Sequence, residues 1–238
     1  NAPGQSIVFA TSVANGGNVA STPTNLDALD VNGTVNKSRY GLQTMSIPAS
    51  GAISRSHMQS PTNTRFQIQP TTVVGFGADI AFNGGQIDFA NDPVYQHVGF
   101  LNAGATSPNQ GAYIRPPYVG ETDFYKYCLT YFDSGTSTPV RLTFDSPVPY
   151  DPTNNRFLSF FILVDAPNDS ITYTIKENGN THKFTINDVQ ATYPDMWSGS
   201  IINMMYVGVS RVSLPAVSAV RSIVVDKVYR YIKPNYNY

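Results

Sequence analysis

Ser170–Ile186, with the sequence SITYTIKENGNTHKFTI, decides the fold. Apolar and polar residues alternate through both halves of this stretch, and Asn178-Gly179 separates the halves. Asn-Gly is the strongest short-range signal for a two-residue β-hairpin turn, because both residues tolerate positive φ. The alternation gives the hairpin one apolar face, which the rest of the chain must cover. The stretch therefore predicts an antiparallel hairpin that packs on a second layer.

The chain around the hairpin is also divided into short strands. Phe157–Val164 is almost continuously apolar, which predicts a strand buried on both faces at the centre of the core. Further strand patterns recur between Gly- and Pro-containing turns, and the one helical pattern, near Asp188–Met196, is interrupted by Pro194. Roughly nine or ten strands at this spacing predict an all-β, jelly-roll-like antiparallel β-sandwich.

The composition agrees with this fold class. Charged residues make up 13% of the 238 residues, about half of the ~25% usual in soluble domains. Glycine (18), proline (17) and tyrosine (15) are frequent instead. Residues 1–50 are the least globular part, since Asn1–Asn36 contains only two charged residues, Asp27 and Asp30. We predict an extended N-terminal arm over residues 1–50 and a single sandwich domain over residues 51–238.

Several classes of partner are disfavoured by the sequence. The formal net charge is −1, and no basic cluster is denser than Lys227, Arg230 and Lys233, which argues against nucleic-acid binding. No segment reaches the roughly 18 apolar residues of a membrane span. A single cysteine, Cys128, cannot form an internal disulfide, and a buried apolar role is favoured over a reactive thiol. The sequence leaves open whether Asn1 is a processed terminus and whether the sequons at Asn32, Asn36 and Asn168 are used.

No motif for catalysis or metal binding is present. His57, His97 and His182 lie outside any G-x-S-x-G context, and none is tied by a motif to Cys128, so structural roles are favoured for all three. Asp79, Asp88 and Asp92 are close enough in sequence to suggest calcium, but caps of turns are the favoured reading. The sequence predicts no catalytic residue, no metal and no cofactor, and a protein that is not an enzyme.

Aromatic side chains are the remaining candidates for a binding site. Trp197 follows Pro194 in a predicted loop, where it would contact a sugar ring or instead close the open end of the core. Tyr193, Tyr118 and Tyr113 suit the same stacking role, and they suit contacts between subunits equally well. We predict that these four residues contact a glycan or a protein partner.

Two functions remain in competition. The low charge, the neutral arm and the Pro-rich loops favour a non-enzymatic jelly-roll building block of a viral capsid, or of a virion or extracellular appendage. Such a protein would assemble through its arm and aromatic loops into a homo-oligomer or with other shell subunits, and would be found in a virion or extracellularly.

The alternative is a carbohydrate-binding β-sandwich. Phe157–Ile232 contains a buried strand, the hairpin, the loop with Trp197 and a closing strand with Asp226. In this order of features the stretch resembles a galactose-binding-like jelly roll, and the resemblance implies a lectin-like module with a glycan as its ligand. A hydrolase whose active site lacks a motif is the least favoured of the readings.

Overall fold

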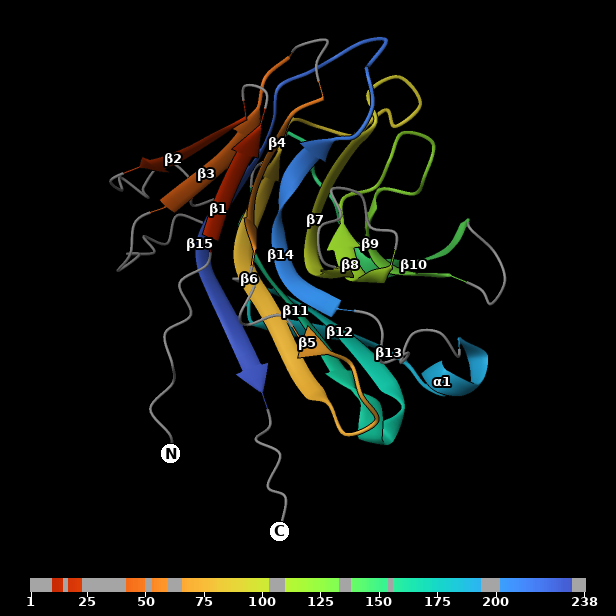
Figure 1. The fold of residues 1–238 in the computed structure, drawn as a ribbon. Helices are drawn as coiled ribbons and strands as arrows, with labels where there is room; N and C mark the ends of the chain where they lie inside the picture. The colour runs from red at the N-terminus through yellow and green to blue at the C-terminus, as the bar shows by residue number, and fades with distance from the viewer. Residues whose placement is uncertain are drawn as a thin grey trace.

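The protein is a sandwich of two antiparallel β-sheets (Figure 1). The computed structural model describes residues 10–14, 17–22, 42–49, 53–59, 66–102, 110–132, 138–153, 156–193 and 202–232. The predicted all-β, jelly-roll-like antiparallel sandwich is confirmed. Helical structure in the described residues consists of a 3-10 turn at Ala166–Asn168 and the short α1 (Val189–Thr192). No helix among them is long and apolar enough to cross a membrane.

Sheet A contains eight strands, in the order β1-β4-β14-β7-β8-β9-β10, with β5 paired to β14. Its strands are β1 (Ala10–Ala14), β4 (Arg55–Gln59), β5 (Phe66–Gln67), β7 (Val94–Asn102), β8 (Gly111–Arg115), β9 (Phe124–Phe132), β10 (Pro139–Pro149) and β14 (Ile202–Arg211). Sheet B contains seven strands, in the order β13-β12-β11-β6-β15-β3-β2. Its strands are β2 (Asn18–Thr22), β3 (Leu42–Ile47), β6 (Val73–Asn83), β11 (Leu158–Asp165), β12 (Ser170–Glu177), β13 (Asn180–Ile186) and β15 (Arg221–Ile232).

The predicted hairpin forms as β12 and β13. Glu177 pairs with Asn180 across the turn, and Asn178 and Gly179 have φ of 49° and 81°. Positive φ at both central residues is what a type I′ turn requires, so the Asn-Gly pair fixes the register of the hairpin. The hairpin lies at one edge of sheet B, with β13 as the edge strand.

The prediction that Phe157–Val164 is buried on both faces is wrong. Along β11, Phe160 and Ile162 are buried in the core, whereas Ser159 and Phe161 on the other face are half-buried. The apolar side chain of Phe161 has a local explanation, because it lies over the glycine at position 75 of β6. The continuous apolar sequence of β11 therefore has two causes. One face packs in the core, and on the other face the aromatic ring of Phe161 packs on a glycine of β6.

The main core fills the space between the sheets. Phe76 of β6 meets Phe100 of β7 edge to face at 6.1 Å between ring centroids. The Phe160 ring lies 5.6 Å from Phe82 and 5.3 Å from Tyr125 in the same manner. Such aromatic pairs stabilise a core by about 0.5–1.5 kcal/mol each beyond the area they bury. They join β6 and β11 of sheet B to β7 and β9 of sheet A.

The strands within residues 1–50 belong to both sheets. β1 pairs with β4 at the edge of sheet A, and β2 pairs with β3 at the edge of sheet B. In β3, Met45 and Ile47 are buried. The division into an arm and a separate sandwich domain stays a prediction.

A buried ion pair holds the loops at one end of the sandwich together. Arg211, at the end of β14, contacts Asp92 with 2.6 Å between Nε and Oδ1, and it also donates to the carbonyl oxygens of Pro48 and Ala219. The Arg211 side chain is 0% exposed and that of Asp92 is 5% exposed. Arg221 approaches the same carboxylate at 3.8 Å. The Arg211–Asp92 pair thus connects segments that follow β3, precede β7 and follow β14.

Candidate functional site

The outer face of sheet A, turned away from sheet B, carries a row of polar and aromatic side chains. Register places Tyr206 of β14 opposite Gly99 of β7, Gly99 opposite Tyr113 of β8, and Tyr113 opposite Cys128 of β9. Because side chains alternate along a strand, residues such as Val98 point into the core while these four face outward. On this face, Leu101, Tyr113, Cys128 and Tyr206 form a cluster of buried side chains that is separate from the main core.

His97 lies beside this row, two residues before Gly99 on β7. Its ring stacks on Tyr206 at 4.6 Å with an interplanar angle of 11°, and it meets the edge of the Tyr113 ring at 5.4 Å. The strand partner of His97 is Gly208. Since neither Gly99 nor Gly208 has a side chain, the imidazole has room to lie flat against Tyr206. His97 is 0% exposed.

Gly99 also allows β7 and β8 to approach closely. Its φ is 154°, and a Cβ atom at this position would lie 2.3 Å from the carbonyl oxygen of Ala112. A larger residue would push the strand that carries His97 away from the strand that carries Tyr113. The close approach of the two rings therefore depends on this glycine.

Arg55 of β4 supplies a positive charge on the same face. It pairs in register with Ser210, which lies on the same face of β14 as Tyr206. Burial raises the pKa of Tyr206, and the charge of Arg55 opposes this shift. Within the described part of the chain, Arg55 forms no ion pair and its Nε has no hydrogen-bond partner. Its charge is thus available to a bound anion.

The tyrosine and histidine side chains on this face differ in how they exchange protons near neutral pH. Burial raises the pKa of both Tyr113 and Tyr206 above the ordinary value of 10.0. Both phenols are protonated at neutral pH and can donate a proton. Histidine is the side chain that ordinarily accepts a proton near neutral pH. Arg55, His97 and Tyr206 together combine a cation, a proton acceptor and a proton donor.

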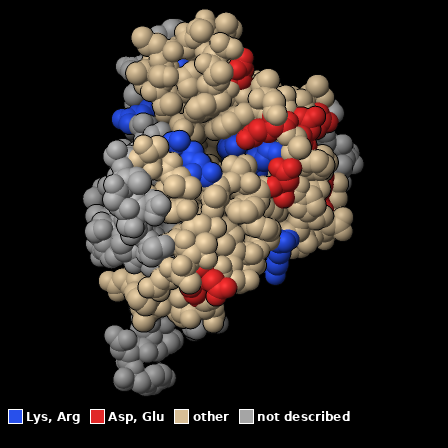
Figure 2. All heavy atoms as spheres, turned by 90° about the vertical axis from the view of Figure 1, so that its right-hand side faces the viewer, with Lys and Arg blue, Asp and Glu red and all other residues tan. Residues whose placement is uncertain are grey.

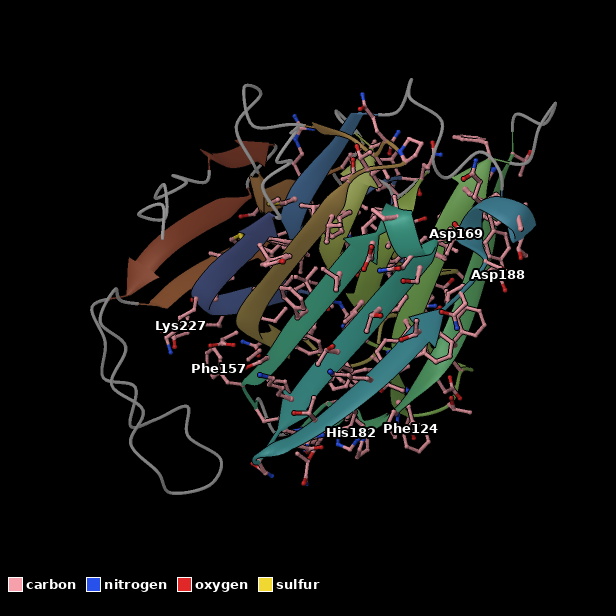
Figure 3. All side chains as sticks on the ribbon, turned by 90° about the horizontal axis from the view of Figure 1, so that it is seen from below. Phe124, Phe157, Asp169, His182, Asp188 and Lys227 are labelled. Carbon is pink, nitrogen blue, oxygen red and sulfur yellow. The ribbon has the colours of Figure 1, made fainter. Side chains whose placement is uncertain are left out.

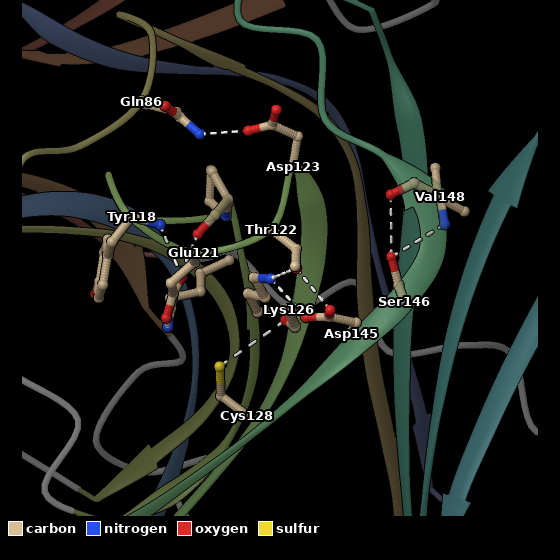
Figure 4. Close-up of polar contacts among 12 residues, drawn as sticks. Gln86, Tyr118, Glu121, Thr122, Asp123, Lys126, Cys128, Asp145, Ser146 and Val148 are labelled. Atoms are coloured by element: carbon tan, nitrogen blue, oxygen red, sulfur yellow. Dashed lines mark hydrogen bonds and ion pairs between the residues drawn. The ribbon is translucent and has the colours of Figure 1, made fainter.

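Two further cations lie next to this group, but carboxylates hold them in place (Figure 4). Arg115 of β8 donates to both carboxylate oxygens of Glu121 at 2.7 Å, and its Cζ lies 3.7 Å from the centroid of the Tyr118 ring. Its strand partner Lys126 contacts Asp145 of β10 at 2.5 Å. These pairs fix the loop after β8 and the edge strand β10. Figure 2 shows Lys and Arg atoms in a hollow of the surface, bordered by a band of Asp and Glu atoms.

The Arg115–Glu121 pair predicts a pH dependence of stability. Burial alone would raise the pKa of Glu121, but the hydrogen bonds from Arg115 and from the Tyr118 backbone outweigh it and lower the pKa. A carboxylate with a lowered pKa stabilises the fold above its unfolded pKa, about 4.3 for glutamate, and loses this effect as pH falls through the folded pKa.

We therefore expect Glu121→Gln to lower the free energy of unfolding by about 1–3 kcal/mol at neutral pH. The difference from the wild type should shrink as pH falls below about 4. Urea unfolding curves of both proteins across this range measure it. A difference that stays constant down to about pH 3 would contradict the assigned ion pair.

The four aromatic residues predicted as a binding site do not form one group. Tyr113 lies in the buried row, and Tyr118 stacks under Arg115. Tyr193 packs at the margin of the core, 4.8 Å from the ring of Tyr131. Trp197 lies outside the described residues, as do the sequons at Asn32 and Asn36 and the side chain of His57. The role of these tyrosines in contacting a glycan or partner stays a prediction.

The three aspartates considered for calcium also lie apart. Asp79 is on the outer face of sheet B near Lys227, Asp88 accepts hydrogen bonds from Asn91, and Asp92 binds Arg211. Among the described residues, no group of three or more His, Cys, Asp or Glu side chains is placed to hold a metal ion.

Comparison with known proteins gives similarity of fold alone. No protein-family model matches the sequence, and no curated protein matches it. The alginate lyase from Klebsiella pneumoniae superposes with a TM-score of 0.53 at 10% identity, covering 82% of this chain and 83% of that one. An exolytic PL7 alginate lyase from Zobellia galactanivorans gives 0.51 at 10% identity, covering 82% and 85%. An alginate lyase described as a member of polysaccharide lyase family 7 gives 0.50 at 11% identity, covering 84% and 86%.

These comparisons correct two sequence-based predictions. The chain was expected to be a non-enzymatic building block of a capsid or appendage, but solved structures that share its fold over four fifths of the chain include alginate lyases. The expectation of no enzymatic activity falls with it, and none of these comparisons supports shell partners. Low charge and Pro-rich loops are properties of many β-sandwiches, so they do not separate shell proteins from enzymes. The carbohydrate-related alternative is the better supported reading.

Sequence reasoning missed Arg55, His97 and Tyr206 as a group. They come from β4, β7 and β14, and only strand pairing brings them to one face. The one local signal is the outward position of His97 in an alternating strand with Gly99 two residues later. Without the register, that signal is equally compatible with a structural histidine.

Proposed function

We propose that the protein is a polysaccharide lyase that cleaves a uronate-containing polysaccharide by β-elimination. The proposal is carried by Arg55, His97 and Tyr206, which lie together on the outer face of sheet A. The shared fold with alginate lyases supports the same class of substrate. Because such polymers lie outside the cell, the proposal implies an extracellular protein.

β-Elimination at a uronate needs a base, an acid and a cation. The base removes the proton from the carbon next to the carboxylate, and the electrons of that bond form a double bond to the neighbouring carbon. The bond from that carbon to the glycosidic oxygen breaks, and the oxygen takes a proton from the acid. The cation stabilises the negative charge that builds up on the carboxylate. No water is consumed.

The residues of the outer face fit these three tasks. Arg55 would bind the carboxylate, because no carboxylate of the described residues neutralises it. His97 would accept the proton. Tyr206 would donate a proton to the departing oxygen, since burial keeps its hydroxyl protonated. The stacking of His97 on Tyr206, with 4.6 Å between ring centroids, supports their use as neighbouring base and acid.

A second candidate is a carbohydrate-binding protein that does not cleave its ligand. It is favoured by one observation, the complete burial of His97. A catalytic imidazole must reach its substrate, whereas a buried one can simply stabilise the face. The two candidates differ in whether a new double bond forms.

The test is incubation of the protein with alginate, with polygalacturonate and with a neutral β-glucan. A lyase should generate ultraviolet absorbance from the unsaturated uronate and new reducing ends in parallel, on at least one polyuronate. The glucan has no carboxylate and should yield neither. Reducing ends without absorbance would indicate hydrolysis and reject the proposal. Binding of a polyuronate with neither signal would favour the second candidate.

A further inference from the structure

A groove lies on the opposite side of the sandwich from His97. It occupies about 710 Å³ on the outer face of sheet B, where it is lined by residues of β6, β11, β12 and β13. Figure 3 shows these strands side by side, with His182 on β13 and Lys227 on β15 beyond β6. The groove shares no lining residue with the Arg55–His97–Tyr206 group. It needs an explanation of its own.

Strand register arranges the residues of the groove in three rows. Ser159, Lys176 and Thr181 lie opposite one another, so do Phe161, Thr174 and Lys183, and Leu163 lies opposite Thr172. Neighbouring strands are about 4.8 Å apart, and residues two apart on a strand are separated by about 6.6 Å. The result is a shallow array of hydroxyl and ammonium groups around one aromatic ring. Such an array matches an extended chain of repeating polar rings better than a compact small molecule.

The Phe161 ring and the Leu163 side chain are the apolar part of this array. The ring lies over Gly75, where a Cβ atom would be 2.3 Å from Cζ of the ring, and the direct strand partner of Phe161 is Gly77. Because these two positions of β6 have no side chains, the ring can pack directly against the sheet. Phe161 remains half-buried, so part of the ring is accessible. A sugar ring presents C–H groups that stack on such an aromatic surface.

The positive charges that line the groove favour an acidic ligand. Lys176 and Lys183 are exposed, and within the described residues neither forms an ion pair. The acidic residue of the lining, Asp79, lies 3.8 Å from Lys227. A neutral glycan would leave both ammonium groups without a charged partner, whereas a chain with regular carboxylates would pair with them.

We propose that this groove binds an acidic polysaccharide without cleaving it and holds the polymer to the protein. The lining includes neither histidine nor tyrosine. It therefore lacks the acid and base of the outer face of sheet A. The proposal does not rest on lyase activity, because binding at Lys176 and Lys183 requires only carboxylates on the ligand.

The test compares two double variants that change the net charge equally. Lys176→Gln/Lys183→Gln removes two positive charges from the groove, and Gln69→Glu/Gln190→Glu adds two negative charges at exposed positions outside it. The dissociation constant for long-chain polygalacturonate is measured by affinity electrophoresis at low ionic strength. We expect the lysine variant to bind about tenfold more weakly, while the glutamate variant stays within about twofold of the wild type.

Two outcomes would overturn the proposal. One is an unchanged dissociation constant in the lysine variant, and the other is an equal loss in the glutamate variant, which would indicate a general charge effect. The absorbance assay on short uronate oligomers separates this test from that of the lyase. A wild type without absorbance would reject the lyase and leave the groove intact, whereas unchanged binding by the lysine variant would reject the groove and leave the lyase intact.

Discussion

Replacement of His97 by glutamine is expected to lower the rate of uronate elimination by about 10²–10⁴-fold. Glutamine is close to histidine in size and keeps hydrogen-bonding groups, but it cannot accept a proton near neutral pH. The stacking position on Tyr206, 4.6 Å between ring centroids, can still be filled. The rate of absorbance increase on polyuronate measures the effect, and thermal unfolding reports whether the variant is folded.

The matched control is His182→Gln. His182 lies on β13, the edge strand of sheet B, and not in sheet A. The His182→Gln variant should keep wild-type activity. A folded His97→Gln protein that keeps its activity within about tenfold would remove His97 from the mechanism.

Asp92→Asn is expected to lower the free energy of unfolding by about 3–5 kcal/mol. Asparagine preserves the shape of the side chain but removes the charge that Arg211 contacts at 2.6 Å. Arg211 is 0% exposed, so its guanidinium would remain buried without a counter-charge. Breaking a buried pair by removing one partner costs far more than losing a surface pair, because the remaining ion cannot be solvated. Urea unfolding measures the loss.

Asp188→Asn is the control for this substitution. Asp188 is exposed, has φ of 53° and makes no side-chain cap hydrogen bond, and asparagine tolerates this conformation. We expect a change within about 0.5 kcal/mol. If Asp92→Asn were as mild as this control, the connection between the segments after β3 and β14 would not contribute to stability.

Sequence reasoning succeeded where a few neighbouring residues determine the structure. Asn178-Gly179 predicts its turn because positive φ is a property of those two residues, and the alternation on either side predicts strands with one buried face. It failed for the two faces of β11. Whether the side of Phe161 is covered depends on Gly75, which lies far away in the sequence.

The candidate site could not be predicted for the same reason. Arg55, His97 and Tyr206 are separated by dozens of residues, and each is unremarkable in its own strand. Their proximity follows from the pairing of β14 with both β4 and β7. Strand order is set by which sheet each strand joins, and no local pattern records it. Local sequence patterns thus predict the fold class, whereas the grouping of the site residues depends on strand pairing between distant segments.

The positions of β14 and β15 bear on how this protein is made. β14 joins β4 to β7 in sheet A, and β15 joins β6 to β3 in sheet B, although both strands come from residues 202–232. On the ribosome, β1 to β4 emerge long before the strands that connect them to the rest of each sheet. Their exposed strand edges then need protection from aggregation. Sheet A cannot be completed during translation until Arg211 has left the exit tunnel, and sheet B cannot be completed until Ile232 has left it.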